Sequence, residues 1–189
     1  DDDFYVGKSN FYAFELINKW PKWEKNILNI CGEKSCGKTH LINIFLKKFD
    51  GIKIESNLLN DENLKTIKPY QNIVLEDLSL DINEKLIYTL LNIIDQDNKF
   101  LVITSSEPIS KIDFKLNDLK SRTKNCLISK IENPDDELMF ALILKNLSDR
   151  QITLDKKLID FIIKRVERSY GKIFEFIYKI DKISLKKKK

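Results

Sequence analysis

Residues 27–48 read ILNICGEKSCGKTHLINIFLKK, and this stretch carries the main clue to the architecture. It begins with a short apolar run, Ile27–Cys31, which favours a buried β-strand. The run leads directly into residues 32–39, which fit the phosphate-loop pattern G-x-x-x-x-G-K-[ST]. Apolar side chains then recur at helical spacing up to Lys48. A strand, a glycine-containing loop and a helix in this order predict a phosphate-binding loop in an α/β protein.

Each fixed position of this loop has a physical task. Gly32 lets the chain turn sharply after the strand, and Gly37 lets the backbone approach phosphates without a Cβ in the way. Lys38 is expected to reach the β- and γ-phosphates, while the Thr39 hydroxyl is expected to bind Mg²⁺. The pattern therefore predicts ATP or ADP with Mg²⁺ as the ligand. The expected phosphate-binding residues are Gly32, Ser35, Cys36, Gly37, Lys38 and Thr39.

The rest of the chain alternates short apolar runs with longer helical patterns, which predicts an α/β sheet of parallel strands. The candidate strands are 27–31, 52–55, 72–75, 100–104 and 126–131. The candidate helices are 11–19, 39–48, 82–95, 135–147, 155–168 and 171–184, and the interval 56–71 has room for one more at most. We therefore expect a nucleotide-binding α/β domain over residues 1–132 and a smaller all-helical domain over residues 133–189.

Two further strands end in polar side chains. Asn72–Leu75 is followed by Glu76 and Asp77, and Phe100–Thr104 is followed by Ser105. Because the carboxyl ends of parallel strands meet at the ligand-binding edge of a sheet, these side chains are expected near the phosphate loop. We predict that Glu76 lies on the metal side and that Asp77 orients the attacking water. Thr104 or Ser105 is a candidate γ-phosphate sensor, and a hydroxyl that caps a turn is an equally good interpretation of either.

Composition excludes several classes of protein. The chain has 33 Lys and Arg against 29 Asp and Glu, and the terminal run Lys186–Lys189 accounts for the excess, so direct DNA binding is not expected. One histidine and three cysteines without a C-x-x-C pair argue against a zinc site and against a disulfide framework. We find no membrane-spanning run and no basic leader, so a cytoplasmic location is expected.

The order of these motifs resembles the AAA+ ATPases, and within them the bacterial replication initiator DnaA and its relatives. The segments that carry the resemblance are Phe4–Asn10, the extended phosphate loop Gly37–Leu41, Thr104–Ser106 and Lys120–Arg122. The resemblance implies a parallel five-stranded αβα sandwich followed by a small helical lid.

The same resemblance assigns roles to further residues. Val6 and Asn10 belong to the segment that lies along the adenine in the initiators, and His40 belongs to the extended loop. Ser105 stands at the first sensor, and Arg122 stands at the arginine finger. The sensor arginine of the lid aligns near 170–172, where no arginine stands, so Arg168 or Lys172 is the expected substitute.

Four other segments are similar to the Hda-type regulators, which are DnaA homologues that inactivate the initiator. These segments are Trp20-Pro21, Asn133–Leu138, Ser148–Gln151 and Val166–Ser169. This resemblance implies an ADP-bound protein that supplies Arg122 in trans to ATP-bound DnaA, stimulates its ATP hydrolysis and so limits initiation of chromosome replication. Glutamate at position 76, one methylene longer than aspartate, predicts weak hydrolysis by the chain itself. Hda-type proteins also bind the DNA polymerase sliding clamp through a short glutamine-containing segment, which residues 1–3 do not contain.

Two other functions remain open from the sequence. One is a homo-oligomeric ATPase that places its arginine finger in the site of another copy of itself. The other is a replication adaptor or helicase loader that uses the nucleotide only as a conformational switch. Turnover that depends on protein concentration would favour the first, and partner binding without stimulated hydrolysis would favour the second.

Overall fold

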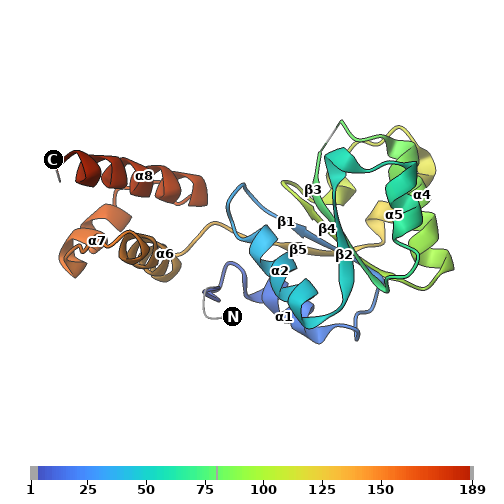
Figure 1. Ribbon diagram of the computed structural model, residues 1–189, viewed down its shortest axis with the longest axis horizontal. Helices are drawn as coiled ribbons and strands as arrows, with labels where there is room; N and C mark the ends of the chain where they lie inside the picture. Colours follow the sequence, from blue (N-terminus) through green and yellow to red (C-terminus); the bar gives the residue numbers. More distant parts are fainter. Residues whose placement is uncertain (1–3, 80, 188–189) are drawn as a thin grey trace. The chain divides into compact units, whose positions relative to one another are not determined.

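The computed structural model describes residues 4–79 and 81–187, which form two compact units (Figure 1). The α/β unit comprises Tyr12–Gly32 and Gly37–Ile131. The helical unit comprises, among the described residues, 4–11, 33–36 and 132–187. The phosphate loop is thus shared, because its residues 33–36 group with the helical unit. The domain boundary expected between 132 and 133 stays a prediction.

The α/β unit contains a sheet of five parallel strands, as predicted. The strands are β1 (Ile27–Cys31), β2 (Gly51–Glu55), β3 (Asn72–Leu78), β4 (Phe100–Ser105) and β5 (Leu127–Lys130), in the order β2-β3-β4-β1-β5. β1 lies between β4 and β5, with Cys31 opposite both Ser105 and Lys130. β3 is longer than the apolar run predicted, since Glu76 pairs with β2 and Leu78 pairs with β4 after a register shift. The polar end of this strand is therefore part of the sheet.

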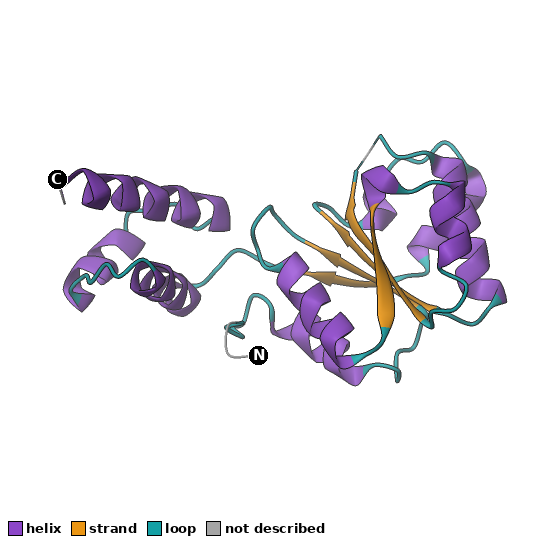
Figure 2. Ribbon diagram, viewed as in Figure 1, coloured by secondary structure: helices purple, strands orange, loops and turns teal. Residues whose placement is uncertain are grey.

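Helices cover both faces of this sheet and give the three layers of an αβα sandwich (Figure 2). They are α1 (Phe11–Lys19), α2 (Lys38–Lys48), α3 (Asp61–Thr66), α4 (Glu84–Gln96) and α5 (Asn117–Lys124), with 3₁₀ turns at Ser56–Leu58 and Ile109–Lys111. The single short helix α3 lies in the interval where one helix at most was expected. α5 was not predicted, because only Leu119 and Thr123 of its eight residues are buried and it lacks apolar periodicity.

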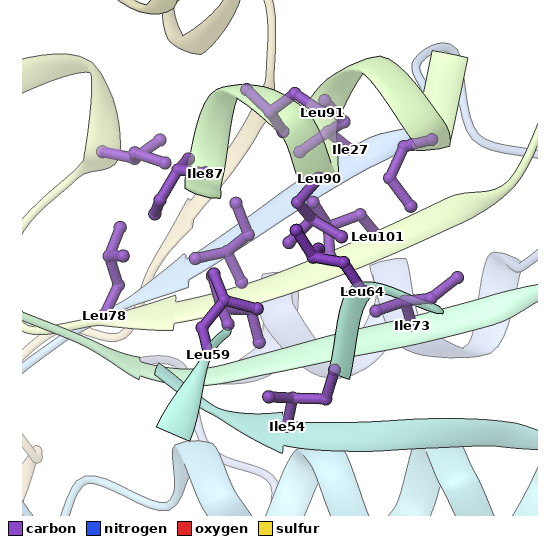
Figure 3. Close-up of a cluster of buried hydrophobic side chains, with 14 of the residues drawn as sticks. Ile27, Ile54, Leu59, Leu64, Ile73, Leu78, Ile87, Leu90, Leu91 and Leu101 are labelled. Carbon is purple, nitrogen blue, oxygen red and sulfur yellow. The ribbon is translucent and has the colours of Figure 1, made fainter. Parts of the chain in front are cut away.

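The main core lies between the sheet and α4 (Figure 3). Leu90 and Leu91 of α4 are fully buried together with Ile73 of β3 and Leu101 of β4. Each such side chain contributes about 1.5–3 kcal/mol when it leaves water, and the parallel strands are buried on both faces. This burial explains why β1, β3 and β4 read in the sequence as nearly uninterrupted apolar runs.

The helical unit is built from α6 (Asp136–Asp149), α7 (Lys156–Ile163) and α8 (Tyr170–Lys187). Asp135 caps α6 by accepting a 2.8 Å hydrogen bond from the Leu138 N–H, which satisfies one of its free donors. α7 ends at Ile163, so the prediction of a helix to 168 was wrong. The N–H groups of Arg165 and Val166 both donate to the Ile162 carbonyl at 2.9 Å, so the chain turns there instead of continuing as a helix. That core comprises Met139, Ile143, Leu147, Ile159, Ile162, Ile163, Ile173 and Ile177.

α8 carries an outer face of alternating charges. Glu175 accepts hydrogen bonds from Lys179 at 2.7 Å and Lys172 at 3.0 Å. These two bonds, of which the one from Lys179 has the larger effect, lower the pKa of Glu175 to about 2. In the part of the chain that the structure describes, neither α8 nor any other helix has the length and apolar character needed to cross a membrane.

Candidate functional site

The phosphate loop leaves the carboxyl end of β1, which lies between β4 and β5 in the sheet. The Gly32 N–H donates to the Ser105 carbonyl of β4 at 3.2 Å, which extends the sheet by one bond before the chain turns. Ser35 and Gly37 have φ of 68° and 98°, in the left-handed region, and α2 begins directly afterwards at Lys38. Gly37 offers no side-chain cap, so the first N–H groups of α2 are not capped from that position. This is the backbone arrangement that binds anions.

Lys38 lies over the loop that precedes it. Its side chain is buried, and its ammonium donates to the Gly32 carbonyl at 2.8 Å. Thr39 is exposed, whereas His40 on the same first turn of α2 is half-buried. The α/β unit thus brings Gly32, Gly37, Lys38 and Thr39 together as the sequence predicted for a phosphate loop.

Glu76, at the end of β3, is a buried carboxylate. It is 6% exposed, and its Oε2 lies 2.8 Å from the ammonium of Lys53 on β2. Burial raises the pKa of Glu76, but hydrogen bonds with Lys53 and Thr39 and the charges of Lys53 and Lys38 lower it by more, so the pKa lies below its usual range. Its Oε1 is buried without a geometrically regular hydrogen bond. An ionised, under-coordinated carboxylate oxygen close to the Thr39 hydroxyl is the donor set that fits Mg²⁺.

Asp77 follows with its backbone in the left-handed region, at φ 51°. Its N–H donates to Thr104 Oγ1 at 2.9 Å, and its carbonyl accepts from Ser56 Oγ at 2.5 Å. A non-glycine residue in this conformation costs about 1–2 kcal/mol, which these two hydroxyls help to offset. The strained turn leaves the carboxylate of Asp77 exposed beside the buried Glu76.

The hydroxyls of β4 are used inside the α/β unit. Thr104 is fully buried and holds Asp77. Ser105 Oγ donates to the Glu107 carbonyl at 2.6 Å and accepts from Asn29 Nδ2 at 2.9 Å. Asn29, on β1, also accepts from the Ile109 N–H at 2.8 Å. Both hydroxyls therefore shape the turns at this edge, which was one of the two interpretations of the sequence, and sensing by Ser105 stays a prediction.

Residues 4–11 form a tight turn within the helical unit. Asn10 is buried; its Oδ1 accepts from the Gly7 N–H and its Nδ2 donates to the Tyr5 carbonyl, each at 2.9 Å. Its amide thus closes the turn, while the neighbouring apolar side chain of Val6 is 36% exposed. This geometry gives Asn10 a role in shaping the turn, and contact of Val6 with a nucleotide stays a prediction.

The two cations predicted for the lid lie on either side of the start of α8. Arg168 pairs with Asp136 at 2.8 Å, and Lys172 pairs with Glu175 at 3.0 Å. Both side chains are more than half exposed, so surface ion pairs of this kind are readily exchanged for another anion. Which of them acts as a sensor stays a prediction.

Arg122 lies near the opposite ends of the strands from the phosphate loop. It is on α5, pairs with Asp95 at the end of α4 and lies over the Tyr88 ring at 5.5 Å. Asp95 also accepts from Asn26, the residue just before β1. Arg122 is therefore at the amino-terminal edge of the sheet, whereas the phosphate loop follows the carboxyl end of β1. The structure does not bring Arg122 together with the other predicted site residues of the α/β unit.

Sequence reasoning missed two polar residues of this site. Lys53 stands in a short edge strand among alternating residues, and only the β2–β3 register places it on the side of Glu76. Asn29 stands in the middle of an apolar strand, where a buried amide interrupts the run ILNIC. The one available signal for Asn29 was its position as a polar residue inside an otherwise apolar strand, where a buried amide must find hydrogen-bond partners.

The sheet order, the phosphate loop after the first strand and the helices that follow the sheet match the fold of AAA+ P-loop modules. No family model matches the chain. It is homologous to DnaA: the "Chromosomal replication initiator protein DnaA" of Helicobacter hepaticus is 26% identical over 197 residues, covering 91% of this chain and 42% of that protein. The protein of the same name from Borreliella afzelii is 29% identical over 192 residues, covering 87% and 39%. The chain thus spans about two fifths of the length of these curated relatives.

Solved structures show the same fold. AMPPCP-bound DnaA from Aquifex aeolicus superposes with a TM-score of 0.77 at 21% identity, covering 95% of this chain and 63% of that chain. The likeness concerns both the parallel sheet and the helices that follow it, since nearly the whole chain is covered. The DnaA-like AAA+ fold inferred from the motifs is therefore confirmed.

Proposed function

We propose that this chain binds ATP or ADP with Mg²⁺ at its phosphate loop. The observation that carries this proposal is the arrangement of Lys38, Thr39 and Glu76, in which a buried ionised carboxylate and a hydroxyl lie beside an anion-binding loop. AMPPCP bound to the structurally similar DnaA supports the same ligand class.

Each residue has a distinct role in this proposal. Phosphate oxygens are bound by the N–H groups from Ser35 to Thr39 and by the Lys38 ammonium. To bind them, the ammonium gives up its hydrogen bond to the Gly32 carbonyl. Thr39 and Glu76 hold Mg²⁺, which neutralises charge on the phosphates when bound. Asp77 orients the water that attacks, from the exposed turn held by Thr104. Val6 and His40 contact the nucleotide, Asn10 shapes the adenine segment, Ser105 shapes the sensor turn, and Arg168 or Lys172 contacts the phosphates.

We further propose that the chain acts on a DnaA-type initiator by supplying Arg122 in trans. β1 has five residues, so its two ends are separated by roughly 13–16 Å, which is more than an arginine side chain spans. Arg122 therefore serves the nucleotide of a neighbouring molecule rather than that of its own chain. The homology to DnaA supports an initiator as that neighbour. To do so, Arg122 would have to leave Asp95 and pair with the phosphoryl charge of the partner's nucleotide.

The decisive experiment is single-turnover ATP hydrolysis by the cognate initiator in the presence of excess ADP-loaded protein, with and without DNA-loaded sliding clamp. Wild type should accelerate hydrolysis, and Arg122→Ala should remove an effect that is about 10³–10⁵-fold in other P-loop systems. Lys124→Ala, which removes an exposed cation from the same helix, is the matched control and should retain the acceleration.

Two other outcomes would assign the chain a different function, and a third would refute nucleotide binding. Turnover by the protein alone that rises with its own concentration would favour the homo-oligomeric ATPase. Binding to a replication protein without hydrolysis by either partner would favour the nucleotide-switched adaptor or helicase loader. Failure of the wild type to bind nucleotide would refute the proposal altogether.

A further inference from the structure

One acidic side chain of the phosphate loop is bound to the start of a lid helix. Within the helical unit, the Glu33 carboxylate accepts hydrogen bonds from the Tyr170 N–H and, at 3.1 Å, from Ser169 Oγ. Tyr170 is the first residue of α8. Glu33 therefore occupies the N-terminal end of an 18-residue helix, where free N–H groups and the helix dipole favour a negative charge.

Tyr170 connects this start of α8 to a third segment. Its side chain is 3% exposed, and its phenolic oxygen lies 3.1 Å from Ser9 Oγ. Burial raises the pKa of Tyr170 to about 12, so the phenol is neutral and remains a hydrogen-bond donor. Ser9 in turn accepts the Glu132 N–H through its carbonyl at 3.0 Å. The N-terminal segment, residue 33 of the phosphate loop and α8 thus meet at one buried side chain.

We propose that Glu33 is a positioning residue, which holds residues 33–36 of the phosphate loop against the start of α8 and so keeps the loop ordered for the nucleotide. This inference rests on the proposed nucleotide binding. It gives a role to Glu33, which stands at a position where the phosphate-loop pattern allows any residue. A carboxylate in a loop that binds polyanions is unfavourable by charge alone. At the start of α8 that charge is compensated by two hydrogen bonds and the helix dipole.

The two explanations for Glu33 predict opposite signs. If Glu33 were only a negative charge near the phosphates, Glu33→Ala would strengthen nucleotide binding. If Glu33 holds the loop in place, the same variant should weaken binding of N-methylanthraniloyl-ADP and -ATP by about tenfold, because the nucleotide must then order a loop that the wild type already holds. Glu33→Gln keeps one acceptor oxygen and the size of the side chain, so it should fold and fall between wild type and Glu33→Ala.

The second measurement is hydrogen exchange of the Tyr170 amide in the full chain without nucleotide. Glu33→Ala should accelerate it by about tenfold or more, since that amide loses its acceptor. Glu137→Ala, which removes an exposed acid from the first turn of α6, is the control and should leave both measurements unchanged.

The outcomes separate this inference from the proposed function. Unchanged exchange at Tyr170, or faster exchange with unchanged or tighter nucleotide binding, overturns the positioning role while nucleotide binding by the wild type stands. A wild type that binds neither fluorescent nucleotide overturns the proposed function and the positioning role together.

Discussion

The ammonium of Lys53 lies 2.8 Å from Oε2 of Glu76, across the neighbouring parallel strands β2 and β3. Lys53 is opposite Val74 in the register, and Val74 and Glu76 lie on the same face because side chains alternate along a strand. The buried acid of the candidate metal site is thus compensated by a lysine that the chain itself supplies. Because the folded state lowers the pKa of Glu76, its ionised form stabilises the fold above the usual glutamate pKa, and this contribution is lost as the pH falls through the lowered pKa.

Lys53→Met should destabilise the protein by about 1 kcal/mol near neutral pH, a modest value because the lysine is partly exposed. The difference from wild type should shrink between about pH 7 and about pH 4, since burial without the ammonium raises the pKa of Glu76 and protonation removes the uncompensated charge. Urea denaturation across this range is the measurement. Lys65→Met, an exposed lysine of α3, is the control, and a difference that grows on acidification would contradict the account.

Thr104→Val should destabilise the protein by about 1 kcal/mol, because the Asp77 N–H loses its acceptor while the left-handed turn remains. Any ATP hydrolysis by the chain should fall as well, since Asp77 would no longer be held. Thr104→Ser keeps the hydroxyl and should restore hydrolysis. Thermal unfolding and turnover of the two variants, compared side by side, test this; equal turnover in Val and Ser variants would remove the positioning role of Thr104.

Asp95→Asn should increase the stimulation of initiator ATPase by several-fold, about the effect of weakening one partly exposed ion pair. The reason is that Arg122 must leave Asp95 to reach a neighbour's phosphates, and a neutral partner holds the guanidinium less tightly. The single-turnover assay with the cognate initiator measures it. Lower stimulation, despite unchanged thermal stability, would show that Asp95 presents the arginine instead of restraining it.

Lys99→Met should destabilise the fold by about 1–3 kcal/mol, because two carbonyls lose a buried charged donor. Lys99 is 6% exposed, and its ammonium donates to the carbonyls of Lys68 at 2.8 Å and Tyr70 at 2.9 Å. Nucleotide affinity should not change, since these residues precede β3 and β4 at the edge away from the phosphate loop. Chemical denaturation and nucleotide titration of the same variant check both parts, and weaker nucleotide binding would be the contrary result.

Much of the fold could be predicted because its signals are local. The strands β1, β3 and β4 read as apolar runs, since they are buried on both faces, and α4 has strong helical periodicity. The misses have physical causes: α5 is almost entirely polar, and β3 continues through Glu76 and Asp77 because both neighbouring strands pair with it. The end of α7 was misplaced because residues 164–166 form a turn closed on the Ile162 carbonyl, which no Gly or Pro in the sequence marks.

The phosphate loop could be predicted from the sequence alone. Gly37, Lys38 and Thr39 are adjacent in the chain, and the turn depends on the conformational freedom of Gly37. Strand identity and the acids at the end of β3 follow in the same way. The Lys53–Glu76 pair, the Thr104 contact with Asp77 and the place of Glu33 at the start of α8 required the folded chain. These contacts join residues far apart in the chain, up to 137 positions for Glu33 and Tyr170. Their geometry comes from strand register and helix packing, which local sequence patterns do not encode.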